Sequence, residues 1–414
     1  MKQRNYAAVF LVLITFFVIS FMTNIIGPLT PDIIKSFNLN LFLVALLPFA
    51  FFIAYGLFSL PTGILMEKYN TKLIMVIAFV LALCGSLLLA FFPNYLSAIL
   101  SLFLIGAGMA MLQVIINPLL RVAGGEEHYA FNSVLAQLIF GLASFVSPLV
   151  YSYLVQNIGN NNSMASKIFS LTPPDLPWIS LYFLFAIVCV LMILVTISFN
   201  IPKMELTNDE KAGNAKAYLQ LIKQPMVLAF FFGIFCYVGT EQVIANWMSQ
   251  YLNVYYGYDP QTTGARAVAY FWGLMTAGGV LGLLMVKIMD SRKVLILFTF
   301  LAMLSLTAAL LFSGEVALVA LPLTGFFASV MYPVIFSLAL NSVTQNHGVF
   351  AGILLTGITG GAILPLITGW IGDHWGLKAG YCFLYITMSY IISIGFWAKP
   401  LITNKTIQLF KKEG

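Results

Sequence analysis

Long apolar runs separated by short polar connections fill almost the whole chain. A helix that spans a bilayer needs about 20 consecutive apolar residues. The first run is too long for a secretory signal peptide and lacks a small-residue cleavage site, so we expect it to remain as a helix. The pattern predicts twelve spanning helices, near residues 7–27, 41–65, 73–92, 95–120, 129–156, 177–200, 226–252, 267–286, 294–313, 316–342, 348–372 and 379–398.

Lysine and arginine are distributed unevenly over the connections between these runs. If the N-terminus is cytoplasmic, the outer side holds only Lys35, Lys167, Arg266 and Lys378 of the 20 basic residues, and the inner side holds the rest. Cytoplasmic loops of membrane proteins carry an excess of Lys and Arg. We therefore expect an even number of spans with both termini cytoplasmic. The location that we expect is the bacterial cytoplasmic (inner) membrane, as a multi-pass protein.

The longest strongly charged connection falls between the sixth and seventh runs and divides the chain in two. We expect an N-terminal six-helix half (1–200), a cytoplasmic linker (201–225) and a C-terminal six-helix half (226–414). A second polar stretch, residues 157–178, is rich in Asn, Ser and Pro. It predicts an outer loop with one short helical piece.

The two halves resemble each other at the connection after their second helix. "GILMEKYNTK" (63–72) and "GLLMVKIMDSRK" (282–293) both contain a Gly, an apolar stretch, an acidic residue and basic residues at the cytoplasmic edge. Two unrelated basic loops would also explain the match, but the helix count and the linker favour repeated halves with a midplane site between them. Gly-rich runs at 273–282 and 355–365 should allow close helix approach.

Composition agrees with a bilayer protein and argues against other classes. The chain of 414 residues is 61% hydrophobic and 8% charged, with a mean hydropathy of +0.96, whereas roughly a quarter of the residues are charged in a soluble protein. The net charge of +6 is spread over short loops, so we expect no nucleic-acid partner. The four cysteines lie in apolar runs without metal or disulfide spacing, which predicts small core residues.

The seventh run contains a carboxylate, in the stretch "YVGTEQVIANW". At 100° per residue, Glu241, Gln242, Asn246 and Ser249 share one side of this helix. Glu241 is the only acidic residue well inside a predicted span, and placing a charge there costs roughly 2.5–3.5 kcal/mol even on an insertion scale. A hydrogen bond to a neighbouring helix would satisfy it. The alternative, which we favour, is that it lines a transport pathway, as a proton acceptor or a sodium ligand.

The fourth run carries a second polar stripe. In "MLQVIINPLLRV", Gln113, Asn117 and Arg121 recur every four residues, and Pro118 removes a backbone hydrogen bond and can kink the helix. Amides commonly join helices in membranes, and Arg121 at the inner edge is typical of a snorkelling side chain. Contact of Gln113 and Asn117 with a substrate is the alternative reading.

Polar side chains at membrane depth define a candidate substrate site. Neutral amides suit a polyhydroxylated ligand, because hydroxyl groups need paired donors and acceptors and not a net charge. An anionic substrate would need basic groups well inside a span, and a bulky cation would favour several carboxylates. A neutral sugar fits best. The candidate substrate-binding residues are Asn24, Gln113, Asn117, Asn132, Gln137, Gln242, Asn246, Tyr270 and Asn341, with Glu241 as the cation-coupling residue.

Several stretches resemble the fucose/galactose/glucose symporter branch of the major facilitator superfamily. The resemblance implies an all-α fold of twelve helices and cation-driven uptake of a monosaccharide by alternating access. It places Gln113 and Asn132 near the sugar, and Glu241 at a position that is acidic in many members. The stretches are "LQVIINPLLRVAGGEEHYAFNSV" (112–134), "YVGTEQVIANWMSQYL" (237–252), "SVMYPVIFSLAL" (329–340) and "GGAILPLITGWIGDHWG" (360–376).

The chain departs from this branch at two positions. Members carry an acid deep in the first helix, where this sequence has Gly27, and a Gln before "AFNS", where it has Tyr129. Without the first-helix acid, Glu241 has to carry more of any coupling, and the ion remains open between proton and sodium.

The sequence therefore predicts a monomeric secondary transporter that imports a neutral hexose or deoxyhexose by cation symport. It predicts no cofactor and no metal site apart from sodium at Glu241. An exporter or uniporter of another small solute is the alternative within the same class. A membrane enzyme or sensor is disfavoured, because no His lies beside a nucleophile in a catalytic arrangement and no phosphate-binding glycine loop is visible.

Overall fold

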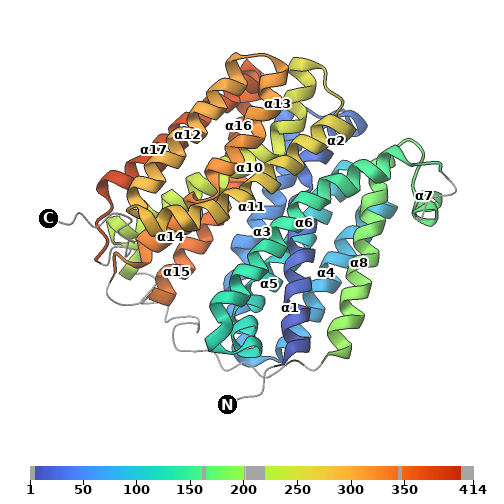
Figure 1. The fold of residues 1–414 in the computed structure, drawn as a ribbon. Helices are drawn as coiled ribbons and strands as arrows, with labels where there is room; N and C mark the ends of the chain where they lie inside the picture. Colours follow the sequence, from blue (N-terminus) through green and yellow to red (C-terminus); the bar gives the residue numbers. More distant parts are fainter. Residues whose placement is uncertain (1–4, 161–164, 200, 202–219, 344–346, 402–414) are drawn as a thin grey trace. The chain divides into compact units, whose positions relative to one another are not determined.

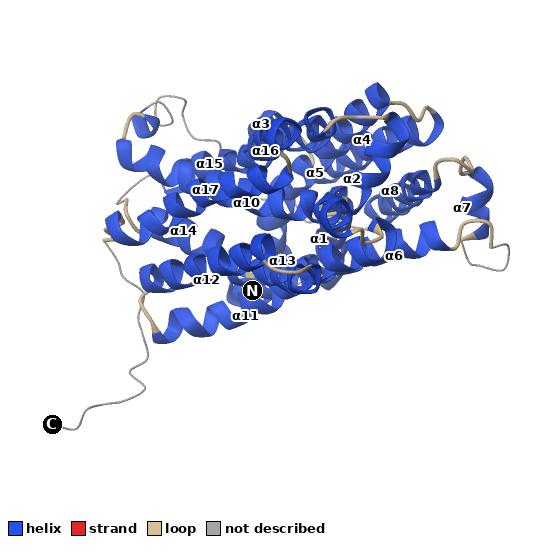
Figure 2. Cartoon of the chain, turned by 90° about the horizontal axis from the view of Figure 1, so that it is seen from above, coloured by secondary structure: helices blue, strands red, loops and turns tan. Residues whose placement is uncertain are grey.

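The computed structural model describes residues 5–160, 165–199, 201, 220–343 and 347–401. All regular elements among them are helical (Figures 1 and 2), which confirms the predicted all-α class. Most of the predicted linker, residues 202–219, lies outside the described residues.

Helix packing divides the chain into two compact units. The first unit contains Met1–Ala212 and Asn246–Ala269, and the second contains Gly213–Ala245 and Tyr270–Gly414. The predicted halves, 1–200 and 226–414, stay a prediction. The connection between the seventh and eighth spans belongs by its packing to the first unit, although its two helices continue into the second.

The first unit holds the helices of the first six spans (Figure 1). Within it, α5 packs against α3 and α4, α1 against α5 and α6, and α4 against α8. Its elements are α1 (Tyr6–Thr23), α2 (Ile26–Phe37), α3 (Leu41–Lys68), α4 (Thr71–Phe91), α5 (Tyr95–Gly124), η1 (Glu126–His128), α6 (Tyr129–Gln156), α7 (Ser166–Leu171), η2 (Pro177–Ile179) and α8 (Ser180–Ser198).

The remaining helices belong to the second unit, except that the end of α10, η3 and the start of α11 belong to the first. In the second unit α12 packs against α13 and α17, and α16 against α17. The elements are α10 (Pro225–Tyr256), η3 (Pro260–Gly264), α11 (Ala265–Ile288), α12 (Ser291–Leu311), α13 (Gly314–Ala328), α14 (Met331–Leu340), α15 (His347–Thr356), η4 (Gly357–Thr359), α16 (Gly360–Trp375) and α17 (Leu377–Trp397).

The described residues contain twelve candidate membrane spans, as the hydrophobic pattern predicts. The short helical piece expected within 157–178 is present as α7. The predicted end of the first span is wrong, because this span covers Tyr6–Phe37 and not 7–27. The chain continues as helix through two prolines, Pro28 and Pro31, since α2 buries Ile26, Leu29 and Ile33 at helical spacing.

Three spans are broken helices. The first span is interrupted at Asn24 and Ile25, between α1 and α2. The tenth is interrupted at Ser329 and Val330, between α13 and α14, and the eleventh passes through the short η4. Discontinuous spanning helices are typical of substrate and ion sites in secondary transporters. The three breaks are therefore candidate positions for such a site.

Polar caps fix where several spans begin. The side chains of Asn40 and Asn94 accept from backbone amides in the first turns of α3 and α5. In the repeated connection, Asn70 caps α4 and Asp290 caps α12, with donor–acceptor distances of 2.9 and 2.8 Å. Asp290 also pairs with Arg292 at 3.0 Å, and the hydrogen bond from that side chain lowers the pKa of Asp290. In both copies of the repeat a side chain caps the following helix. The cap is the amide of Asn70 in the first copy and the carboxylate of Asp290 in the second.

Glycines permit close helix contacts in the two Gly-rich runs, as predicted. A Cβ atom on Gly278 of α11 would lie 2.3 Å from the carbonyl oxygen of Phe326 on α13. A Cβ on Gly360 of α16 would lie 2.0 Å from the carbonyl oxygen of Phe235 on α10. Side chains larger than glycine have no room at these two crossings.

The four cysteines are free thiols, but they do not all lie in the core. Cys189 is buried and Cys236 is half-buried, whereas Cys84 and Cys382 are exposed. The prediction of core positions is wrong for the last two. An apolar neighbourhood in the sequence indicates core in a soluble protein, but in a bilayer protein it is equally typical of the lipid-facing surface.

Candidate functional site

Glu241 lies in the middle of α10 in a small polar cluster of the second unit. Its carboxylate accepts a hydrogen bond from the Tyr237 hydroxyl at 2.5 Å and one from the Gln242 side-chain amide at 3.1 Å. Tyr237 and Gln242 are buried, while Glu241 is half-buried. Both donors belong to α10 itself. In the described residues, Glu241 is therefore not used to bond a neighbouring helix, which was the alternative to a functional role.

Three aromatic rings pack in a row next to this carboxylate. The Tyr237 ring packs against Tyr332 of α14 with centroids 5.8 Å apart, and Tyr332 stacks on Phe336 at 5.7 Å. Tyr332 lies in the first turn of α14, just after the break in the tenth span. A broken helix and a hydrogen-bonded carboxylate thus meet in one place, which is the arrangement expected of an ion or substrate site in a transporter.

The other polar side chains of α10 have different partners. Ser249 lies against η3, where its hydroxyl donates to the carbonyl oxygen of Pro260 at 3.4 Å. Thr240 shares a 2.6 Å hydrogen bond with Thr387 of α17. Asn246 is buried, and its amide nitrogen has no hydrogen-bond partner among the described residues. Because buried donors are normally satisfied, the Asn246 amide remains a candidate for substrate contact.

Asn24 forms a polar seam between α1 and α6 in the first unit. It caps the end of α1 at the helix break, and its amide nitrogen donates to the Ser144 hydroxyl at 2.8 Å. Ser20 and Ser144 share a further hydrogen bond of 2.6 Å, and the Ser147 hydroxyl donates to the carbonyl oxygen of Phe21. The seam holds the Asn24 amide in one orientation at a discontinuity of the first span.

The two amides of the predicted stripe on α5 differ in exposure. Gln113 is half-buried and Asn117 is exposed. On α6, Gln137 is exposed, and Asn132 lies one turn from the helix start with its amide packed against Gly124. A Cβ on Gly124 would lie 2.3 Å from the Asn132 nitrogen, so this glycine makes room for the amide.

Two further candidates in the second unit have contacts other than with the polar cluster around Glu241. Tyr270 is exposed, near the start of α11. Asn341 caps the end of α14, its amide reaches Ser337, and its carbonyl oxygen accepts from the Leu401 amide at 2.8 Å. The contacts of Asn341 are those of a helix end. Six candidates thus lie in the first unit, and Glu241, Gln242, Tyr270 and Asn341 lie in the second.

Sequence reasoning missed Asp32, because it placed this residue in a loop. The first span includes Asp32, so Glu241 is not the only acidic residue inside a span. Asp32 is half-buried and accepts hydrogen bonds from Tyr151 of α6 and Gln261 of η3. The helical spacing of Ile26, Leu29 and Ile33 was the signal that could have extended the span.

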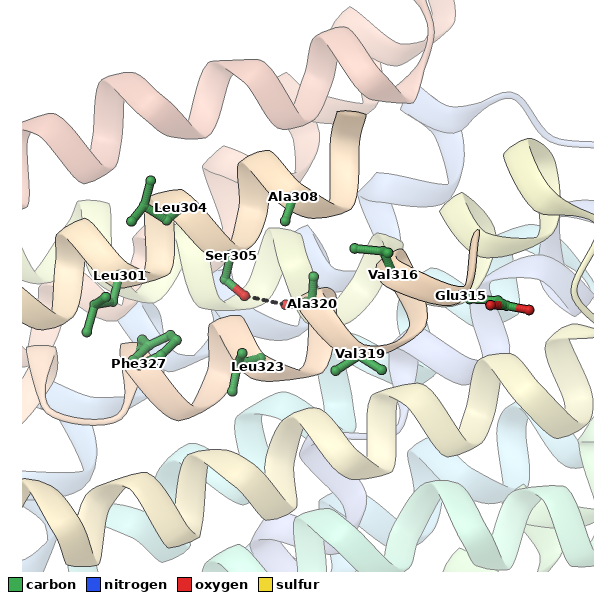
Figure 3. A pocket seen from close by; sticks show the side chains of 10 residues that line it. All are labelled: Leu301, Leu304, Ser305, Ala308, Glu315, Val316, Val319, Ala320, Leu323 and Phe327. Carbon is green, nitrogen blue, oxygen red and sulfur yellow. Dashed lines mark hydrogen bonds between the residues drawn. The ribbon is translucent and has the colours of Figure 1, made fainter. Parts of the chain in front are cut away.

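A groove between α12 and α13 has a different character (Figure 3). Its volume is about 550 Å³, and its one internal hydrogen bond joins the Ser305 hydroxyl to the carbonyl oxygen of Ala320 at 2.8 Å. Such an apolar surface cannot pair the hydroxyl groups of a sugar. The lining residues are Leu301, Leu304, Ser305, Ala308, Glu315, Val316, Val319, Ala320, Leu323 and Phe327.

Twelve candidate spans and a polar cluster at mid-depth in one of them are the features of a multi-pass membrane transporter. A sequence profile of the Major Facilitator Superfamily matches residues 12–356 and, in a second match, 230–406. These matches cover most of the chain. The chain therefore belongs to the Major Facilitator Superfamily, as the resemblance of its motifs predicted.

Curated relatives match the chain over nearly its full length. A protein named glucose/galactose transporter from Brucella abortus biovar 1 (strain 9-941) is 29% identical over 404 residues, which cover 95% of each chain. The L-fucose-proton symporter of Escherichia coli (strain K12) is 26% identical over 406 residues, 91% of this chain and 89% of the relative. A crystal structure of the E. coli fucose:proton symporter has a TM-score of 0.66 at 22% identity, covering 96% of this chain and 100% of that one.

Proposed function

We propose that the protein imports a neutral monosaccharide, a hexose or deoxyhexose, together with a proton. The names of the relatives, a glucose/galactose transporter and an L-fucose-proton symporter, support both the substrate class and the ion. The observation that carries the proposal is the hydrogen-bonded carboxylate of Glu241 at membrane depth in α10. We further propose a monomer in the bacterial inner membrane, with both termini cytoplasmic.

The surroundings of Glu241 favour a proton over sodium. A sodium ion needs oxygen lone pairs from several ligands, whereas Tyr237 and Gln242 direct an O–H and an N–H toward the carboxylate. A carboxylate held by two donors can still take up one proton, which neutralises it.

The charge distribution favours a neutral substrate. In the described part of the chain, the basic residues of the spans lie in their first two or last two turns. An anionic substrate would require such groups at mid-depth. The candidate residues Asn24, Gln113, Asn132 and Asn246 instead offer amides, which can both donate to and accept from sugar hydroxyl groups.

The proposed cycle follows from these groups. Glu241 accepts a proton while its site is open to the outer side, and Tyr237 and Gln242 keep the carboxyl group in position. Neutralisation lowers the cost of holding the group away from water during the conformational change. Release of the proton to the inner side then makes the cycle favourable in the direction of uptake.

The experiment that tests this function is uptake into proteoliposomes. A panel of labelled glucose, galactose, fucose and a charged sugar phosphate is offered under an inward proton gradient or an inward sodium gradient. We expect accumulation of at least one neutral sugar with the proton gradient alone, and none of the sugar phosphate. Accumulation driven only by sodium, or exchange without accumulation under either gradient, would contradict proton symport.

The Asn24 seam gives a second expectation. Asn24→Ala should raise the half-saturating sugar concentration by about tenfold, which corresponds to one lost hydrogen bond of about 1.4 kcal/mol. Asn157→Ala is the matched control, because the Asn157 side-chain amide donates to the carbonyl oxygen of Tyr153 at the end of α6. An unchanged half-saturating concentration in Asn24→Ala would remove this residue from the site.

A further inference from the structure

Asp32, Tyr151 and Gln261 form a polar cluster that the proposed transport reaction does not use. The Tyr151 hydroxyl donates to one carboxylate oxygen of Asp32. The Gln261 amide nitrogen donates to both oxygens, at 3.0 and 3.3 Å. Tyr151 is fully buried, and the other two side chains are half-buried. Hydrogen bonds to a charged acceptor are stronger than those between neutral groups.

The three residues come from distant parts of the chain and meet at one end of the first unit. Asp32 lies on α2 in the last part of the first span, and Tyr151 lies near the end of α6, the fifth span. Gln261 lies in η3, between the end of α10 in the seventh span and α11, in the first turn of the eighth candidate span. Counted from the N-terminus, the chain has crossed the membrane once at Asp32, five times at Tyr151 and seven times at Gln261. Because each of these numbers is odd, all three residues lie at the membrane face opposite the N-terminus. Here α2 and α6 both pack against η3.

The connection that carries Gln261 is internally braced. Asn253 donates to the carbonyl oxygen of Tyr258 at 3.0 Å, and Asp259 accepts from the backbone amide of Thr262 at 2.9 Å. Gly264 lies so close to α10 that a Cβ there would be 2.3 Å from the Ser249 hydroxyl oxygen. These contacts hold Asn246–Ala269 as one piece, which by its packing belongs to the first unit, while α10 and α11 continue into the second.

We propose that Asp32, Tyr151 and Gln261 form a latch that docks the connection between α10 and α11 onto α2 and α6. The connection docks and undocks as one braced piece, and the latch sets how often it is undocked. The break between α1 and α2 lets the segment that carries Asp32 adjust without moving α1. This inference goes beyond the proposed function and does not depend on which solute is carried.

Hydrogen–deuterium exchange of the full-length protein in lipid nanodiscs tests the latch. Tyr151→Phe removes only the hydroxyl, and Gln261→Glu places two carboxylates against each other. Exchange across residues 246–269 should rise together, by about fivefold in Tyr151→Phe and by more in Gln261→Glu. The double variant with Asp32→Asn and Gln261→Glu exchanges carboxylate for amide, so it should restore exchange to within about twofold of the parent.

The control variant is Ser36→Ala. It removes the 2.9 Å hydrogen bond from the Trp178 indole to the Ser36 hydroxyl at the same end of α2 and leaves Asp32, Tyr151 and Gln261 unchanged. Exchange of the connection should stay at the parental rate in this variant. Unchanged exchange in Tyr151→Phe or Gln261→Glu, an equal rise in Ser36→Ala, or failure of the double variant to restore protection would overturn the latch.

Discussion

Replacing Glu241 with glutamine should abolish gradient-driven accumulation of sugar while exchange of sugar across the membrane continues. A membrane potential of about 100 mV is worth about 2.3 kcal/mol per charge, enough to hold a roughly fiftyfold sugar gradient at one proton per sugar. The glutamine side chain retains the size of glutamate and can accept from Tyr237, but it cannot bind and release a proton. The accumulation ratio should therefore fall to about one.

The measurement compares net accumulation with counterflow in proteoliposomes that contain equal amounts of folded protein. Glu315→Gln is the matched control, since Glu315 lies in the first turn of α13, at the apolar groove and outside the polar cluster. This control should accumulate sugar like the parent. Parental accumulation in Glu241→Gln would show that another group carries the coupling.

Replacing Gly360 with alanine should destabilise the second unit more than other Gly→Ala changes. The added Cβ would lie 2.0 Å from the carbonyl oxygen of Phe235 and 2.9 Å from its Cα, which is backbone that cannot swing aside. Overpacking of this kind costs about 1–3 kcal/mol. Because Phe235 lies on α10, shortly before Glu241, the displacement should also reduce transport.

Gly279→Ala is the control for Gly360→Ala, because it adds the same methyl group to a different helix. A Cβ at Gly279 of α11 meets nothing within 4 Å, so the change should be neutral or slightly stabilising through helix propensity. Thermal unfolding of the purified variants measures the difference. Equal melting temperatures for the two variants would mean that α10 and α16 can separate without cost.

The hydrophobic pattern predicted the number of spans, because length and hydropathy of an apolar run are enough to define a bilayer helix. The polar stretch 157–178 predicted the short α7, and the Gly-rich runs predicted the close helix contacts. The pattern failed at the first span, where Pro28, Pro31 and Asp32 looked like a loop. Burial of Ile26, Leu29 and Ile33 offsets the helix-breaking tendency there, and a sequence window cannot show that Asp32 finds partners 119 and 229 residues away.

The candidate site was predictable in kind but not in detail. A carboxylate in an apolar run makes Glu241 a candidate from the sequence alone, because the cost of burying a charge is a property of the residue. Its partners depend on side-chain geometry. Sequence spacing put Gln242 and Asn246 on the same face of α10. Gln242 bonds Glu241, whereas the amide nitrogen of Asn246 has no hydrogen-bond partner in the described residues. Asn341 lies at the end of α14 and Cys382 on the outer surface of α17. Both placements depend on where helices end and which face is exposed.

The central claim is that Glu241 carries the proton that accompanies each sugar. Sugar-induced proton movement tests it directly, because it measures the coupled ion without requiring a preset gradient. Addition of a transported sugar to lightly buffered proteoliposomes should make the medium more alkaline with the parent protein and leave its pH unchanged with Glu241→Gln. Equal alkalinisation by both proteins would contradict the claim.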